Sequence, residues 1–196
     1  MGRRTLDNID QKILRMTVKI GAKKGVERIS TLDLAKKLDI SEGTIFVHYK
    51  TKPNLLNQAF LFVMKRTQLL FERVRDCEPT RTDFFEVWSD LLKTMLDNSD
   101  YTRYFYSYTQ YFGFEKFHKE IGHDKEYIAA VKKVVDSNDG LITDDRALRI
   151  WNFTFNSSVR YVINILNRGQ SYDEDDARFA FELIYGVLFN HPDFNF

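Results

Sequence analysis

The sequence has little that would support a disulfide-linked or membrane-spanning protein. Its single cysteine, Cys77, cannot form an internal disulfide, and such sparse use of cysteine fits a reducing compartment. No apolar run approaches the roughly 18–20 residues that a membrane-spanning helix needs. Residues 1–11 also lack the apolar stretch of a signal peptide. We therefore expect a cytoplasmic protein without a membrane segment.

The sequence is also poor in proline and in the signals of β-structure. Only three of its 196 residues are proline, and apolar and polar residues nowhere alternate over a strand's length. Apolar residues recur instead at helical spacing, and they are numerous enough to fill a sizeable core. These features predict an all-α protein with about nine helices.

The net charge of +1 conceals a division along the chain. Residues 1–75 hold 16 Lys and Arg against 7 Asp and Glu, whereas residues 76–196 hold 13 against 21. A basic first part and an acidic remainder are typical of a protein that binds a polyanion with one end.

Four helices are expected in the basic part. Ser30, Ser41 and Thr51 are suitable N-cap residues, and Asp33 stands where a capping box needs an acidic or amide side chain. Pro53 is tolerated in the first turn of the last helix. The predicted helices cover about 9–24, 31–38, 42–48 and 52–74.

A break at 76–83, "DCEPTRTD", separates this part from the rest. Thr143 and Ser171 can begin the last two helices beyond it, and Gly169 can end the first of these two. The expected helices are about 81–97, 101–111, 124–137, 144–168 and 172–190. We predict a DNA-binding domain at 1–51, a connecting helix at 52–75 and a second helical domain at 76–196.

The two short helices at 31–38 and 42–48 have the length and spacing of a helix-turn-helix unit. Asp39 occupies the turn, where a left-handed backbone is expected, and Asp tolerates that conformation better than most residues. Small side chains on the outward face of the second helix would let it enter a DNA major groove. That face consists of Glu42, Gly43, Thr44, Val47 and His48.

The stretch "ISTLDLAKKLDISEGTIFVHYKTKPNLL" resembles the DNA-binding signature of the tetracycline-repressor (TetR) family of bacterial transcription regulators. The resemblance covers about residues 9–60. The shared positions are Ala35, Ile40, Gly43, Thr44, Phe46, His48, Tyr49, Lys52, Leu55 and Leu56.

The resemblance implies roles for individual residues. Thr44 and His48 match positions that contact DNA, Lys52 matches a phosphate-binding lysine, and Ser30 or Thr31 matches a polar residue that touches the DNA backbone. Two positions depart from the family: Phe46 replaces a tyrosine, and Asp39 replaces the turn glycine. Tyr49 can supply the hydroxyl that Phe46 lacks. The implied partner is double-stranded DNA with a palindromic operator, and no cofactor is expected.

Nine aromatic residues crowd into 101–117. Such density suits a pocket for a small apolar effector, which family members typically bind in the second domain before releasing DNA. Two alternatives remain: the rings fill an ordinary core, and the protein is controlled by a partner or by its abundance. The expected effector-binding residues are Trp88, Tyr104, Tyr108, Phe112, Trp151 and Phe155.

An enzyme is the competing class of protein. Glu115 and His118, then Glu120 and His123, have the Glu-x-x-His spacing of carboxylate-bridged metal sites. The two pairs lie on one segment, however, whereas such sites draw their ligands from facing helices. The sequence also lacks a nucleophile elbow and a phosphate-binding loop. We expect neither catalysis nor a bound metal.

A single recognition helix reads few base pairs, so we expect a homodimer. The last two helices carry abundant apolar residues, and in the resembling family they form the dimer interface. The alternative is that these side chains serve the core of one chain. The expected interface residues are Phe155, Val159, Tyr185 and Leu188.

Overall fold

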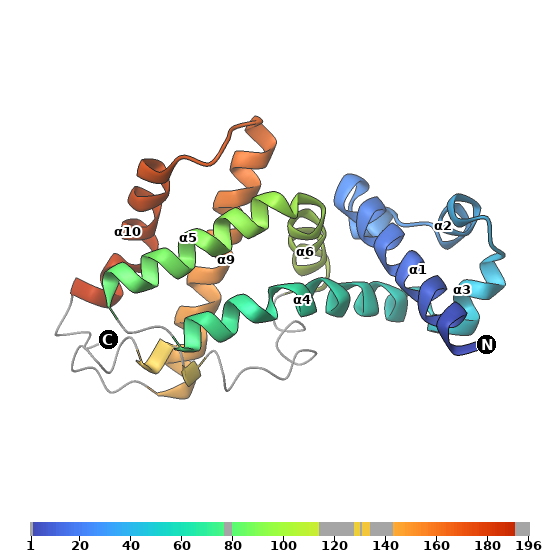
Figure 1. The fold of residues 1–196 in the computed structure, drawn as a ribbon, viewed down its shortest axis with the longest axis horizontal. Helices are drawn as coiled ribbons and strands as arrows, with labels where there is room; N and C mark the ends of the chain where they lie inside the picture. Colours follow the sequence, from blue (N-terminus) through green and yellow to red (C-terminus); the bar gives the residue numbers. More distant parts are fainter. Residues whose placement is uncertain (1, 77–79, 114–127, 130, 134–142, 191–196) are drawn as a thin grey trace. The chain divides into compact units, whose positions relative to one another are not determined.

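The computed structural model describes residues 2–76, 80–113, 128–129, 131–133 and 143–190 (Figure 1). Over these residues the chain is entirely helical apart from its connecting turns, which confirms the predicted all-α fold. None of the described helices combines the length and apolar character that crossing a membrane requires. The helices are α1 (Gly2–Lys24), a 3-10 turn η1 (Val26–Arg28), α2 (Thr31–Leu38), α3 (Glu42–Tyr49), α4 (Lys52–Asp76), α5 (Arg81–Asp97), α6 (Ser99–Phe112), α9 (Asp144–Arg168) and α10 (Glu174–Asn190).

Most helix boundaries follow the local signals in the sequence. The Ser30 hydroxyl accepts a hydrogen bond from the backbone N–H of Asp33, and Thr143 accepts one from Arg146. Gly169 ends α9 with a left-handed backbone (φ 64°). Ser30, Thr143 and Gly169 therefore act as predicted, and the predicted bounds of α2, α5 and α9 are confirmed.

The start of α10 differs from the prediction. The helix begins at Glu174, and its first turn is capped by Asp173, whose Oδ1 accepts a hydrogen bond from Asp176 N at 2.9 Å. Ser171 lies too early to reach these amides, because a cap bonds N–H groups two or three residues further on. The expected helix at 124–137 falls largely outside the described residues; 128–129 and 131–133 are helical.

The chain divides into two compact units. The first comprises residues 1–66 and 99–120, and the second comprises 67–98 and 121–196. This division departs from the boundaries drawn along the sequence, because α6 packs with the N-terminal helices. Tyr104 of α6 donates its hydroxyl hydrogen to Leu56 O at 2.9 Å, and Val26 N donates to Ser107 Oγ at 2.9 Å.

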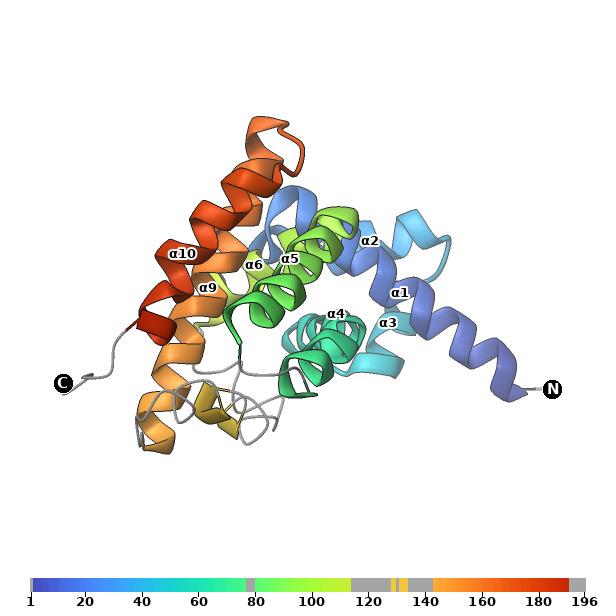
Figure 2. The same cartoon turned by 60° about the vertical axis from the view of Figure 1, so that its left-hand side comes forward.

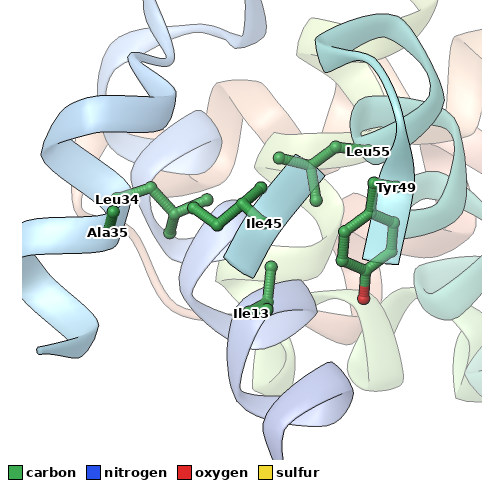
Figure 3. Close-up of a cluster of buried hydrophobic side chains, with 6 residues drawn as sticks. All are labelled: Ile13, Leu34, Ala35, Ile45, Tyr49 and Leu55. Atoms are coloured by element: carbon green, nitrogen blue, oxygen red, sulfur yellow. The ribbon is translucent and has the colours of Figure 1, made fainter. Parts of the chain in front are cut away.

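The core of the first unit holds α2 and α3 against α1 (Figure 3). In the close-up, Ile13 of α1 approaches Ile45 of α3, which in turn meets Leu34 of α2. All three side chains are fully or almost fully buried. The two short helices are thus fixed to a longer one, which they need because isolated helices of this length are not stable in water.

In the second unit, α9 and α10 lie side by side with α5 (Figures 1 and 2). Their core is aromatic: Trp88, Phe181 and Tyr185 pack with ring centroids 5.3–6.0 Å apart. Trp88 also donates its indole N–H to Ser158 Oγ at 2.8 Å. A buried polar group that finds a partner in this way costs little stability.

Candidate nucleic-acid interface

The turn between α2 and α3 has the predicted conformation. Asp39 adopts a left-handed backbone (φ 54°, ψ 47°), and Ile40 N bonds to Ala35 O at 3.1 Å. Ser41 then begins α3 and accepts a hydrogen bond from Thr44 N at 3.0 Å. This series of contacts closes α2 and starts α3 within four residues, as a helix-turn-helix unit requires.

The outward face of α3 is partly apolar. Val47 is 69% exposed, and Gly43 and Phe46 are also exposed. Glu42, Thr44 and His48 are half-buried beside them. Phe46 was not among the predicted contact residues, although a phenylalanine exposed beside Val47 is itself a signal of a binding surface.

Two polar contacts connect residues of this face to the residues before them in the chain. Thr31 donates its hydroxyl hydrogen to Glu42 Oε1 at 2.6 Å, so the carboxylate of Glu42 is held by the first residue of α2. The hydroxyls of Ser41 and Thr44 share a hydrogen bond of 2.9 Å. These contacts fix α3 to the start of α2 and orient Thr44.

The far end of α3 is tied to α1 through Asp10. His48 Nδ1 lies 2.7 Å from Asp10 Oδ1, and the Tyr49 hydroxyl lies 3.2 Å from the same oxygen. Burial and the nearby Asp10 carboxylate raise the pKa of the Tyr49 phenol, which therefore remains a hydrogen-bond donor. Tyr49 is buried, so the structure places this predicted DNA contact inside the domain. Asp10 was missed because no local motif relates it to a residue 38 positions away.

The joint between α3 and α4 carries the remaining predicted contact. Lys52 Nζ donates to Glu27 O at 3.1 Å, at the N-terminus of α4. Before it, Lys50 has a positive φ of 63°, and Thr51 N bonds back to Tyr49 O at 2.6 Å. A hydrogen bond from residue i+2 back to residue i, around a central residue with positive φ, defines a classic γ-turn, which is rare and strained.

Together these features define an all-α protein with a helix-turn-helix DNA-binding domain. Residues 13–59 match the family described as "Bacterial regulatory proteins, tetR family". An HTH-type transcriptional regulator of Haemophilus influenzae is 28% identical over 93 residues, which are 47% of this chain and 48% of that protein. The matched stretch thus spans about half the length of the curated relative. Residues 13–59 therefore carry the DNA-binding segment of the TetR family of bacterial transcription regulators.

Solved structures share the whole fold. A TetR family regulator from Marinobacter aquaeolei VT8 has a TM-score of 0.70 at 21% identity, covering 94% of this chain and 97% of that one. NalD, the secondary repressor of the MexAB-OprM multidrug efflux pump in Pseudomonas aeruginosa, has a TM-score of 0.65 at 13% identity, covering 94% and 97%. At these identities the likeness establishes the helical arrangement.

The six predicted effector-binding residues fall into the two units. Tyr104 and Tyr108 belong to the first, where both are completely buried and Tyr108 donates to Asn57 Oδ1 at 2.7 Å. Phe112 packs against Tyr108 with the two rings tilted and their centroids 4.6 Å apart. The other three, in the second unit, are also buried: Trp88, Trp151 and Phe155.

The predicted interface residues are already covered by their own chain. Phe155, Val159 and Tyr185 are at most 4% exposed, whereas the side chain of Leu188 lies outside the described residues. For these three, the structure favours the alternative of a core within one chain. The exposed apolar side chains of the same two helices are Phe153, Phe179 and Leu183.

The residues of the competing metal-site hypothesis, at 115–123, lie outside the described part of the chain. Within the described part, no three His, Cys, Asp or Glu side chains gather in a way that could hold a metal ion.

Proposed function

We propose that this chain acts as a homodimeric repressor, which binds a two-fold symmetric DNA site and leaves it when a small, largely apolar molecule binds. The observation that carries the proposal is α3 itself. Its outward face is exposed at Gly43, Phe46 and Val47, while both of its ends are fixed to neighbouring helices. A helix that is held at both ends and exposes its outward face in this way can enter a major groove.

The residues of this face suit different DNA groups. The methyl groups of Val47, which is 69% exposed, can meet thymine methyls, and the hydroxyl of Thr44 can bond to base edges or phosphates. Lys52 stands at the N-terminus of α4, where its charge and the positive end of the helix dipole both favour a phosphate. Base contacts would set the sequence, and Lys52 would add affinity for any sequence.

The dimer would place two copies of α3 about 34 Å apart, one helical turn of DNA. Phe153 of α9 and Phe179 and Leu183 of α10 are each about two-thirds exposed, at 67–68%. Phe179 and Leu183 are four residues apart and therefore share one face of α10. We assign the interface between protomers to these three side chains rather than to the buried Phe155, Val159 and Tyr185.

The effector would bind in the second unit. Trp151 and Phe155 stack there with centroids 5.5 Å apart, and they supply apolar, aromatic area. On the same helix, Asn152 Oδ1 is buried and has no hydrogen-bond partner among the described residues. An unsatisfied buried acceptor costs free energy, which a ligand with one N–H or O–H donor would recover. NalD, which shares this fold, is a repressor of an efflux pump, and this likeness supports repression as the mode of action.

Selection from random duplex DNA by the purified full-length chain tests the central claim. We expect enrichment of a two-fold symmetric sequence, whose binding falls steeply with salt because lysines displace counterions from phosphates. Thr44→Ala should weaken binding to the enriched duplex more than to unrelated DNA. If no duplex is enriched, or if Thr44→Ala and Val47→Ala leave binding unchanged, α3 is not a recognition helix.

A further inference from the structure

One carboxylate holds the last two residues of the recognition helix. Asp10 Oδ1 lies 2.7 Å from His48 Nδ1 and 3.2 Å from the Tyr49 hydroxyl, and the Asp10 carbonyl lies 3.3 Å from that same hydroxyl. Asp10 belongs to α1, whereas His48 and Tyr49 end α3. The contact therefore joins two helices that are far apart in the sequence.

The distance between His48 and Asp10 has a chemical consequence for the imidazole ring. A carboxylate oxygen only accepts hydrogen bonds, so Nδ1 must carry the hydrogen that lies between the two groups. This holds for the neutral ring and for the charged ring alike. Nε2 is then the only polar atom of His48 that is left to face DNA.

We propose that Asp10 is a positioning residue for DNA binding: it fixes the orientation of the His48 ring and keeps a hydrogen on Nδ1. This inference rests on the proposed function, because it assigns a role to a residue behind the DNA-reading face. The His48 side chain is 14% exposed, and the ring edge that carries Nδ1 faces Asp10 within the protein. Asp10 selects which nitrogen occupies which edge.

Tyr49 supports the position of the Asp10 carboxylate. Its hydroxyl lies 3.2 Å from the same Oδ1 atom and 3.3 Å from the Asp10 carbonyl, so a second hydrogen-bond donor holds this carboxylate oxygen beside α3. Without Asp10 the ring of His48 can turn over and exchange its two nitrogens. The DNA would then meet a mixture of ring orientations, and part of the binding free energy would be spent on ordering the ring.

The first test concerns the free full-length protein and needs no DNA. Nitrogen NMR of the His48 imidazole, recorded where its shifts show the neutral ring, reports which nitrogen carries the hydrogen. We expect it on Nδ1 in the wild type and in Asp10→Asn, whose amide oxygen still accepts. In Asp10→Ala we expect a mixture. A hydrogen on Nε2 in the wild type would overturn the proposal, even if Asp10→Ala did not fold.

The second test measures affinity for a duplex that the wild-type chain has selected from random DNA. Asp10→Ala should bind about tenfold more weakly, as for the loss of one charge-assisted hydrogen bond. In a His48→Ala background the same change should cost less than about twofold, because the residue it positions is gone. Equal losses in both backgrounds would mean that Asp10 supports the fold only, and would overturn the proposal.

Asp39→Asn is the matched control for charge. Asp39 belongs to the same unit, and the acidic partner of His48 among the described residues is Asp10; asparagine also tolerates the left-handed backbone of Asp39. Both Asn variants remove one negative charge, so a shared gain in affinity measures electrostatics alone. Asp10→Asn should match Asp39→Asn within about threefold, which is a rescue relative to Asp10→Ala. If wild-type protein selects no duplex, the proposed function fails, whereas the NMR result still stands by itself.

Discussion

At the scale of single residues, Lys50 has an unfavourable backbone. Its φ of 63° and ψ of −47° belong to a conformation that side chains with a Cβ rarely adopt. A non-glycine residue in such a conformation destabilises the protein by about 1–3 kcal/mol. Glycine avoids this strain, and its greater loss of chain entropy on folding costs only about 0.5–1 kcal/mol. Lys50→Gly should therefore raise the free energy of unfolding by about 1 kcal/mol, measured by urea denaturation.

Lys37→Gly is the control for this change. Lys37 is exposed in the last turn of α2, with no positive φ. Glycine in a helix costs about 1 kcal/mol, so this variant should be less stable than the wild type. Opposite signs for the two Lys→Gly changes are expected. A loss of stability in Lys50→Gly as well would contradict the strained turn.

Lys52 allows a second prediction at this scale. Lys52→Ala should weaken binding to selected and unrelated DNA by similar factors and reduce the slope of log affinity against log salt by roughly one, the share of one phosphate contact. Lys65→Ala, an exposed lysine further along α4, serves as the control. If Lys52→Ala and Lys65→Ala show the same slope of log affinity against log salt in a shift assay, Lys52 does not contact a DNA phosphate.

Local chemistry explains which residues the sequence could predict. Ser30, Ser41 and Thr143 cap amides only three residues away, and Asp39 adopts the left-handed turn by its own preference, so short stretches were sufficient. The contact of Asp10 with His48 depends on how α1 crosses α3, which no local pattern records. The periodicity of α9 likewise identified an apolar helix but not which side of it the same chain covers.

At the scale of helices, the close approach of α1 and α6 depends on Gly21. A Cβ at this position would lie 2.6 Å from the Tyr104 ring, whose hydroxyl is held by Leu56 O. The ring cannot move aside without losing that bond. Gly21→Ala should therefore destabilise the protein by about 1–3 kcal/mol, as overpacked cores do.

Gly43→Ala is the matched control on α3. The nearest atom to a Cβ there is Ser41 Oγ at 3.6 Å, an ordinary contact. Alanine favours helix over glycine, so this variant should keep or gain up to about 1 kcal/mol of stability. Its added methyl group lies on the DNA-reading face, and so affinity should fall. Thermal unfolding and a shift assay separate the two effects; a stable Gly21→Ala protein would show that α6 can shift.

The position of α6 also shows why domain boundaries were harder to predict than helices. Chain order placed it after the break at 76–83, in the second domain. Its tyrosines instead bond to Leu56 and Asn57 in the N-terminal half of α4. Aromatic side chains fit a core and a pocket equally well in a sequence, and only their hydroxyl partners decide between the two.

At the scale of the whole molecule, the proposed homodimer can be tested by one substitution in its proposed interface. Leu183→Glu would place a charge in the proposed interface, where burying an unpaired charge is costly. We expect the dimer mass of the wild type in light scattering at micromolar concentration, and the monomer mass for this variant. Thr82→Glu, an exposed position at the start of α5, should remain dimeric. A monomeric wild type would remove the proposal.

The connection between the two units suggests how a ligand would act on DNA binding. α5 of the second unit leads through Asn98 directly into α6, and α6 is bonded to α4 through Tyr104 and Tyr108. A ligand that shifts α5 would therefore pull on the helix that carries the DNA-binding domain. A preference of about 100-fold for the state unable to bind DNA supplies up to roughly 2.7 kcal/mol of coupling.

Tyr108→Phe should interrupt this coupling. It removes the hydroxyl that bonds to Asn57 Oδ1 and keeps the ring, which stacks on Phe60 at 4.2 Å. Apolar compounds that raise the melting temperature of the wild type should also lower its affinity for the selected duplex. In Tyr108→Phe the same compounds should still raise the melting temperature, because they bind in the other unit, but should release DNA several-fold less well.

If no apolar compound shifts the melting temperature, control by a protein partner or by abundance becomes the better account. If Tyr108→Phe releases DNA as readily as the wild type, the signal does not pass through α6.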